Sequence, residues 1–175
     1  MTLGKPPRLE RIFQIYDPPI YFVTLCTSQR RKILANEFVH RVLINYGERG
    51  RERGNALGRY VIMPDHIHLF VCGSDDFNLG IWVRGLKRVV AAAVAGGREG
   101  DVERKDSAAV TAAATTGAAA ARAIWQRGFF DHIIRNSESY SEKWDYVREN
   151  SARAGLVQLA EEWPFQGEIM LIEHR

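Results

Sequence analysis

The sequence has only two cysteines, no long apolar run and no strong excess of either charge. Cys26 and Cys72 each lie inside an apolar stretch and form no Cys-x-x-Cys pair, so neither a disulfide framework nor a thiolate zinc site is indicated. No apolar run approaches the roughly 20 residues that span a bilayer, and the N-terminal MTLGKPPRLERIF lacks the apolar core of a signal peptide. We therefore expect a cytoplasmic protein with reduced thiols and no membrane partner.

The chain has 175 residues and a formal net charge of +3 at pH 7. This length supports one ordinary hydrophobic core, so we expect a single domain over residues 1–175. A mildly basic chain is compatible with a nucleic-acid partner but does not require one. Charge alone therefore leaves the class of function open.

The order of apolar patterns along the chain predicts alternating strands and helices. Runs rich in β-branched and aromatic residues indicate strands, and apolar residues three or four apart indicate helices. Pro64-Asp65 separates two apolar runs, which favours a β-hairpin, and Asn36 is a typical helix N-cap. The predicted elements are a strand at 20–27, a helix at about 37–50, hairpin strands at 58–63 and 66–72, a helix at 77–95, a strand from about 128 and a helix from 137 to about 150.

This β-α-β-β-α-β order is that of the ferredoxin-like fold, in the α+β class. We expect an antiparallel sheet with its helices on one face, the strand at 66–72 in its centre, and a further C-terminal helix. Between 96 and 123 the chain reads GGREGDVERKDSAAVTAAATTGAAAARA, with almost no large apolar residue. We interpret this segment as a flexible, Ala-rich insertion that the core does not need.

The stretch RYVIMPDHIHLFV places two imidazoles two residues apart in the most apolar part of the chain. In a strand, His66 and His68 project to one face while Ile67 and Leu69 project to the other. A pair of histidines on a strand is more often structural than functional. Here, however, a polar pair on an otherwise apolar strand needs a partner. Two neutral imidazoles side by side form half of a metal site.

Several chemistries that use a His-x-His pair do not fit this sequence. A metallo-β-lactamase-like site needs a further Asp and His just downstream, and a barrel amidohydrolase needs about 250 residues. A closed structural zinc site needs four nitrogen or sulfur ligands. An open site that suits a hard divalent cation with water and phosphate remains.

The segment KWDYVREN is a candidate for the other half of the site. On a helix, Tyr146 and Asn150 are neighbours on one face because they lie four residues apart. Asn150 would supply a carbonyl oxygen to the metal, and Tyr146 would direct its phenol at a bound phosphate. The alternative is that Tyr146 is a core residue of an amphipathic helix. Tyr140, on the same helix, competes for either role.

Three segments together resemble one known family. YVIMPDHIHLFV, WQRGFFDHIIRNSESY and WDYVRENSARAGLV, in this order and spacing, resemble the REP-associated tyrosine transposases. These are relatives of the single-strand insertion-sequence transposases of the HUH endonuclease class. The resemblance runs from about Leu9 to the tail EEWPFQGEI and skips the Ala-rich segment.

The resemblance implies a role for each matching residue. Tyr146 matches the nucleophile, His66 and His68 match the metal-binding pair, and Asn150 matches the residue that completes a Mg²⁺ or Mn²⁺ site. Such enzymes cut single-stranded, hairpin-forming DNA and leave a 5′-phosphotyrosine link with a free 3′-OH. Relatives occur as monomers and as homodimers. Where they commonly read Asn-Pro, this chain reads Asn150-Ser151, which puts the helix boundary in doubt.

Basic residues would contact the DNA backbone, although any single one is more often a solvated surface charge. His132 is a further candidate for phosphate contact or proton transfer. Trp125 and Phe129 are candidates for stacking on bases, with core packing the favoured role. The candidate phosphate contacts are Arg30, Arg31, Arg84, Lys87, Arg88 and Arg127.

Three functions remain open from the sequence. The first is a metal-dependent endonuclease and strand transferase that acts on single-stranded or hairpin DNA. The second is an inactive or domesticated relative that binds DNA hairpins without cutting them. The third is a metal-dependent phosphodiesterase for small nucleotides.

Overall fold

The computed structural model describes residues 18–96, 121–134 and 137–172. The expected Ala-rich insertion lies outside these ranges except for Gly96 and residues 121–123, which are helical together with residue 124. No helix in the described ranges is both long enough and apolar enough to cross a membrane.

The described elements follow the predicted order. Asn36 caps the first helix as expected, because its side-chain oxygen accepts a hydrogen bond from the backbone N–H of Val39 at 3.0 Å. The elements are β1 (Ile20–Cys26), a 3₁₀ turn (Ser28–Arg30), α1 (Glu37–Gly50), a 3₁₀ turn (Arg51–Arg53), β2 (Asn55–Ile62), β3 (His66–Gly73), α2 (Leu79–Gly96), β4 (Phe130–Ile134), α4 (Ser137–Arg148), α5 (Asn150–Arg153), a 3₁₀ turn (Ala160–Glu162) and β5 (Gln166–Glu168).

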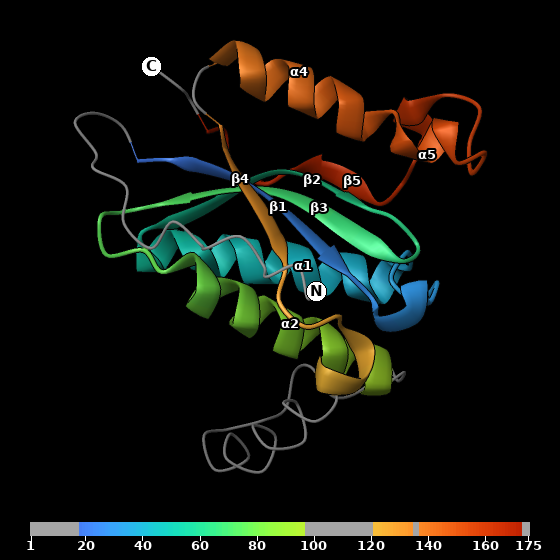
Figure 1. The fold of residues 1–175 in the computed structure, drawn as a ribbon, viewed down its shortest axis with the longest axis horizontal. Coiled ribbons are helices and arrows are strands. Elements are labelled where there is room, and N and C mark those ends of the chain that lie inside the picture. The colour runs from blue at the N-terminus through green and yellow to red at the C-terminus, as the bar shows by residue number, and fades with distance from the viewer. Residues whose placement is uncertain (1–17, 97–120, 135–136, 173–175) are drawn as a thin grey trace, which may run out of the picture.

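The sheet has the order β4-β1-β3-β2-β5, and every neighbouring pair is antiparallel. Figure 1 shows α1 and α2 against one face and α4 over the opposite face. The prediction of a ferredoxin-like α+β fold with β3 at its centre is confirmed. The short strand β5 extends the sheet beyond the predicted elements.

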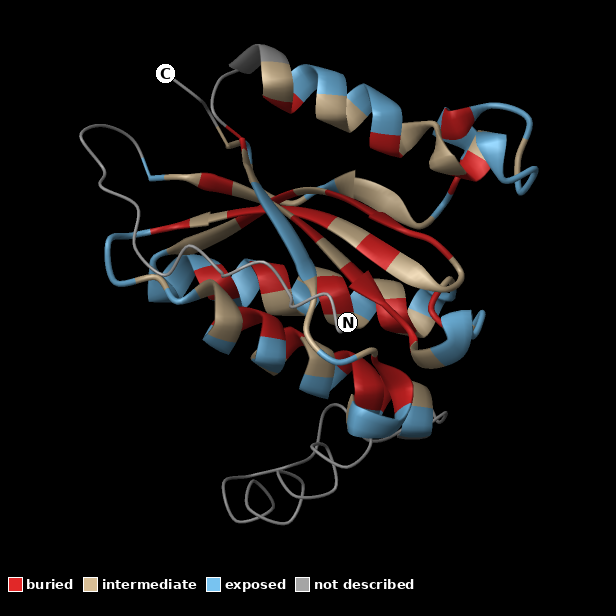
Figure 2. Cartoon of the chain, in the orientation of Figure 1, coloured by how far each residue is buried: buried red, intermediate tan, exposed pale blue. Residues whose placement is uncertain are grey.

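The main core lies between the sheet and the helix pair α1 and α2. Ile67 and Leu69 of β3 are fully buried on this face, and Leu86 of α2 packs in the same cluster. Figure 2 shows the buried residues of the two helices facing the sheet. Each such side chain contributes roughly 1.5–3 kcal/mol on burial. The apolar residues of β3 therefore fix which face of the strand points into the core.

Packing against α1 explains why a glycine, Gly85, lies in the middle of α2. A Cβ atom there would collide with the hydroxyl of Tyr46 on α1. That hydroxyl donates to the backbone carbonyl of Trp82 at 2.8 Å. The missing side chain therefore lets a polar group of α1 reach a carbonyl of α2.

The opposite face carries a smaller core under α4. Tyr140 of α4 is 7% exposed and packs edge-on against Phe70, with ring centroids 4.7 Å apart. The Arg59 guanidinium of β2 lies 5.3 Å from the Tyr140 ring centroid and 5.4 Å from that of Trp144. Arg59 also pairs with Glu168 of β5 at 3.4 Å. A few aromatic rings and one arginine thus attach α4 to the sheet.

Tyr60 predicts how stability changes at high pH. Its side chain is 3% exposed, its hydroxyl lies 2.7 Å from His40 Nε2, and burial raises its pKa to about 12. Above pH 10 the unfolded chain loses this proton while the folded chain keeps it, so the free energy of unfolding falls toward pH 12. We expect Tyr60→Phe to flatten that fall, as measured by urea unfolding at several pH values. An unchanged slope would contradict this assignment. Tyr60→Phe also loses the contact with His40, which lowers the free energy of unfolding by the same amount at every pH in this range. This constant loss does not affect the comparison, because only the slopes of the free energy of unfolding against pH are compared.

Candidate active site

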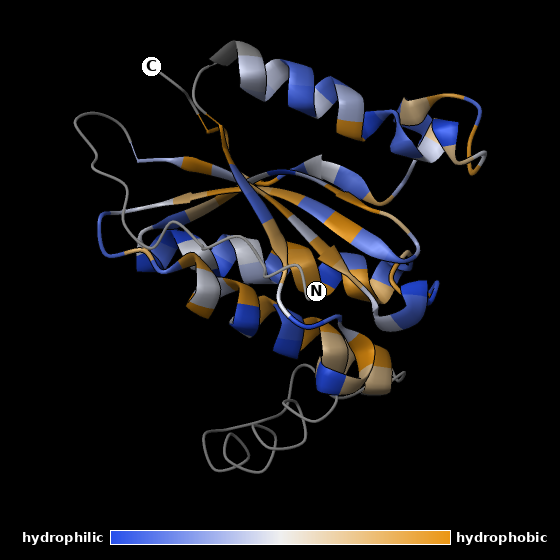
Figure 3. Ribbon diagram, viewed as in Figure 1, coloured by the Kyte–Doolittle hydropathy of each residue, from blue (hydrophilic) through white to orange (hydrophobic). Residues whose placement is uncertain are grey.

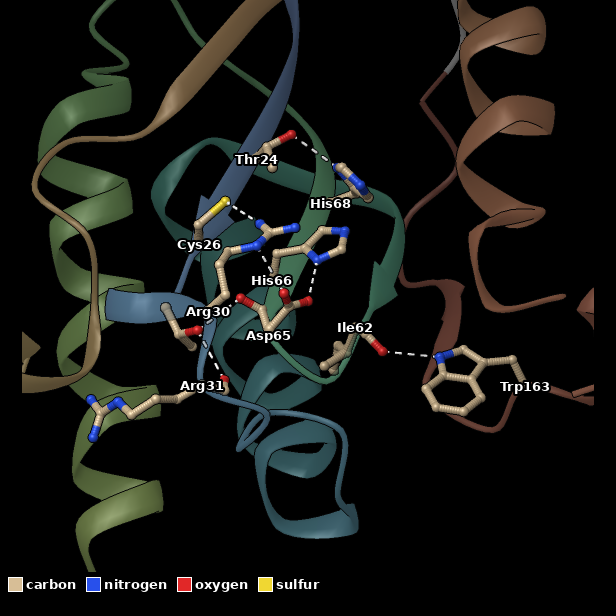
Figure 4. Close-up of polar contacts among 10 residues, drawn as sticks. Thr24, Cys26, Arg30, Arg31, Ile62, Asp65, His66, His68 and Trp163 are labelled. Carbon is tan, nitrogen blue, oxygen red and sulfur yellow. Dashed lines mark hydrogen bonds and ion pairs between the residues drawn. The ribbon is translucent and has the colours of Figure 1, made fainter. Parts of the chain in front are cut away.

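Strand β3 carries His66 and His68 on the face of the sheet that α4 covers. Their neighbours Ile67 and Leu69 are fully buried on the other face, as the alternation predicts. The two imidazole ring centroids are 4.7 Å apart, with an angle of 82° between the rings. Figure 4 shows both imidazoles projecting from β3 toward the same side. The predicted pairing of the two rings is confirmed.

The Nδ1 atom of each imidazole has a polar partner. His66 Nδ1 lies 2.6 Å from Asp65 Oδ1, and His68 Nδ1 lies 2.9 Å from Thr24 Oγ1 (Figure 4). A proton on each Nδ1, donated to these oxygens, leaves a lone pair on each Nε2. Metal-binding histidines are typically held in this way by a second group. The pair therefore has the chemistry of two oriented nitrogen ligands.

The charge state of His68 also suits a ligand. Burial, reinforced by the neighbouring His66 imidazole and by the cations Arg30 and Lys143, lowers the pKa of His68 to about 3. The ring is therefore neutral at neutral pH. A neutral imidazole is the form that binds a cation.

Arg30 approaches the pair from a strained turn after β1. Its Nε lies 2.9 Å from Asp65 Oδ2, and its guanidinium donates to Cys26 Sγ at 3.1 Å (Figure 4). Gln29 and Arg30 adopt φ values of +56° and +54°, which residues other than glycine rarely adopt. The turn thus brings Arg30 to the carboxylate that holds His66.

Tyr146 and Asn150 come together through a third residue, Arg153. Tyr146 is 62% exposed, and the Arg153 guanidinium lies 4.3 Å from the centroid of its ring. The same guanidinium donates to the backbone carbonyl of Tyr146 and, at 2.6 Å, to Asn150 Oδ1. The predicted neighbours therefore share one face of the α4–α5 segment. Tyr140, by contrast, is buried, and burial raises its pKa to about 12, so it is a core residue.

Helix α4 lies over the sheet face that carries the histidines. The Lys143 ammonium lies 5.5 Å from the centroid of the Phe22 ring, which stacks on His68 with centroids 5.3 Å apart. Among the residues that the structure describes, no three His, Cys, Asp or Glu side chains are grouped to hold a metal ion. A metal site here would therefore depend on the two imidazoles and an uncharged oxygen, as the sequence predicts for Asn150.

Four of the predicted DNA contacts line one groove between the outer face of α2 and residues 121–129. The groove has a volume of about 1200 Å³. Lys87 also donates to the carbonyls of Gln126 and Gly128, at 3.0 and 2.5 Å, so its charge holds this loop to α2. The basic residues of the groove are Arg84, Lys87, Arg88, Arg122 and Arg127.

The other predicted contacts lie elsewhere. Arg30 is at the histidine pair, whereas the exposed Arg31 donates to the carbonyl of Ala123. His132 is exposed on β4. Trp125 is 4% exposed, and the partly buried Phe129 packs against the same core, so the favoured core role is confirmed for both.

The sequence reasoning missed four polar residues that contact the predicted site or place charge near it. Asp65 directly precedes His66, and Thr24 faces His68 across the β1–β3 pairing. Lys143 and Arg153 lie three residues from Tyr146 and Asn150 respectively. The turn position of Asp65 and the helical spacing of the two cations are signals that could have identified three of the four.

The fold and the paired histidines, with a tyrosine helix over the same face, are those expected of the HUH class of tyrosine transposases. A family model described as "Transposase IS200 like" matches residues 19–150. The chain belongs to the IS200-like transposase family.

Individual relatives agree with this assignment. The REP-associated tyrosine transposase of Escherichia coli is 26% identical over 66% of this chain and 55% of its own length. A Haemophilus influenzae protein assigned as a REP-associated tyrosine transposase is 24% identical over 83% of this chain and 77% of its own. The solved structure of a REP-associated tyrosine transposase bound to a REP hairpin aligns with a TM-score of 0.60 and 19% identity. It covers 95% of this chain and 96% of the other.

Ser151 stands at the position where the resemblance leads us to expect proline, yet the helix still breaks. Helix α4 ends at Arg148 and α5 begins at Asn150. Ser151 is fully buried, and its hydroxyl has no hydrogen-bond partner among the described residues. A buried hydroxyl without a partner lowers stability.

We expect Ser151→Ala to raise the free energy of unfolding by about 1 kcal/mol, because it removes this unsatisfied group. Urea unfolding of both proteins measures the difference. The matched control is Ser141→Ala, an exposed serine on α4, for which we expect little change. Destabilisation by Ser151→Ala would show that the hydroxyl has a partner.

Proposed function

We propose that this protein cuts and rejoins single-stranded DNA through a covalent link to Tyr146. The observation that carries the proposal is the pair His66 and His68, on the face covered by the helix that bears Tyr146, with no partner for either Nε2 atom among the described residues. Membership of the IS200-like transposase family supports the same chemistry.

In the cutting step, Tyr146 Oη forms a bond to a backbone phosphorus while the bond to the 3′ oxygen breaks. The phenol proton passes to solvent, and the leaving oxygen takes up a proton to become a 3′-OH. The product is a 5′-phosphotyrosine link, whose energy is kept for rejoining. Attack by a 3′-OH on this link reverses the step and releases Tyr146.

Residues of this chain prepare the reacting groups. Arg153 lies over the Tyr146 ring and binds Asn150, which restricts the orientation of an otherwise exposed side chain. Lys143 and Arg30 place positive charge near His68, where a phosphate would need it.

His66, His68 and Asn150 would hold Mg²⁺ or Mn²⁺, and the amide oxygen, together with oxygens of water and phosphate, would supply the hard donors that these ions prefer. The oriented Nε2 atoms fit such an ion, because the other nitrogen of each ring is already occupied. A bound ion would polarise the phosphate and offset the charge that develops in the transition state.

The DNA partner that we propose is a hairpin with a single-stranded flank. A REP hairpin is bound in the structural relative, and the groove along α2 offers Arg84, Arg122 and Arg127 to phosphates. We place the reaction in the cytoplasm, as expected from the sequence.

The first test is covalent trapping. Purified protein is incubated with a labelled hairpin that carries its genomic flank, with Mn²⁺ or EDTA, and resolved on a denaturing gel. We expect a metal-dependent protein–DNA band that Tyr146→Phe and His66→Ala abolish and that Tyr140→Phe, the matched control, retains. A band that survives in Tyr146→Phe would show that another residue is the nucleophile. Tight hairpin binding without any band would favour a domesticated binding protein instead.

A second test concerns the ion. We expect Asp65→Ala to weaken Mn²⁺ binding by about 10- to 100-fold, since Asp65 orients His66. Isothermal titration calorimetry without DNA measures this directly. Asp75→Ala, an exposed aspartate in the turn after β3, is the control and should bind Mn²⁺ like the wild type. Equal affinities for all three proteins would argue against a metal at this pair.

A further inference from the structure

One row of side chains crosses the sheet at the level of His68. In the strand register, His68 of β3 lies opposite Thr24 of β1, and Thr24 lies opposite Phe130 of β4. Ile134, four residues after Phe130, packs in the cluster under α4. Because side chains two and four residues apart share a face, Phe130 projects on the face that carries the histidines.

Phe130 is the exposed end of this row. It is 67% exposed, on a strand that forms the edge of the sheet among the described elements. Figure 2 shows most of β4 as exposed, while α4 covers other parts of the same face. A single exposed phenylalanine is common on protein surfaces, so exposure alone assigns no role.

The surroundings of Phe130 supply the second observation. Phe130 lines a small cavity together with Thr24, the residue whose hydroxyl contacts His68. Arg127 lines both this cavity and the basic groove along α2. The cavity thus lies between the groove and the histidine pair. Two spacings between strands put Phe130 about 10 Å from His68, which a few nucleotides span.

This combination fits a nucleobase better than a protein side chain or a lipid. An exposed ring offers a flat apolar face, and Arg127, which lines the same cavity, offers a partner for a phosphate. Aromatic rings stack on any base, so such a contact binds single strands regardless of sequence. Paired bases of a hairpin stem are stacked on each other, so the contact requires an unpaired nucleotide.

We infer that Phe130 is a stacking platform for an unpaired base of the strand that enters the site. The inference rests on the proposed function and deepens it, because it names a residue that binds the single-stranded flank next to the scissile phosphate. It also gives the stacking role to Phe130 and leaves Trp125 and Phe129 in the core.

The test measures binding in a Tyr146→Phe background with EDTA, so that no cutting occurs. Fluorescence anisotropy compares a hairpin that carries a single-stranded flank with the same hairpin without it. We expect Phe130→Leu to weaken binding of the flanked hairpin about tenfold, within the range for one base stacked on an aromatic ring. Binding of the hairpin alone should not change. Phe130→Trp, which keeps an aromatic face, should bind both as the parent does.

A 2-aminopurine placed at successive flank positions locates the stacked base. We expect fluorescence quenching at one position with the Phe130 parent and no quenching there with Phe130→Leu. Equal binding of the flanked hairpin by both proteins, or an equal loss for both DNAs, would overturn the inference.

These outcomes separate the two proposals. A covalent band in the wild type together with no effect of Phe130→Leu would reject the platform and keep the nuclease. A selective effect of Phe130→Leu without any covalent band would keep the platform on a DNA-binding protein and reject the nuclease. Absence of binding to either DNA would reject both.

Discussion

The alternation of β3 is the constraint on which the site depends. Ile67 and Leu69 are fully buried against α1 and α2, and this forces His66 and His68 to the opposite face. A shift of one residue in register would place both imidazoles in the apolar core and expose both aliphatic side chains. Each buried aliphatic residue contributes roughly 1.5–3 kcal/mol, so the register is strongly specified. The main core therefore fixes the histidine pair without touching it.

The two faces of the sheet are held in different ways. Two helices with broad apolar faces cover one side, whereas α4 is largely hydrophilic in Figure 3 and contacts the sheet through a few residues. Tyr140, Trp144 and Val147 supply the apolar contacts, and Arg59 lies against the two aromatic rings. The sheet, packed by two helices on its other face, thus carries the imidazoles, and the more lightly attached helix carries Tyr146.

Local periodicity predicted most of this fold, and long-range contacts account for the rest. The strands, the hairpin at Pro64-Asp65 and the shared face of the histidines follow from patterns within a few residues of one another. The spacing of Tyr140, Trp144 and Val147 marks the buried face of α4, so the sequence could also have assigned Tyr140 to the core. By contrast, β5 has three residues and forms only because β2 pairs with it. The left-handed turn at Gln29 and Arg30 contains no glycine, so there was no local signal in the sequence from which to predict it.

The charges around the histidine pair explain what the proposed site still needs. Asp65 is the carboxylate that contacts the pair, and Arg30 already neutralises it at 2.9 Å. Lys143 adds positive charge near His68. A divalent cation beside two neutral imidazoles would therefore find little negative charge from these residues. Under the proposed function, the DNA phosphate supplies that charge, so the ion and the DNA should each strengthen the binding of the other. A site of this composition is best suited to a substrate that is itself an anion.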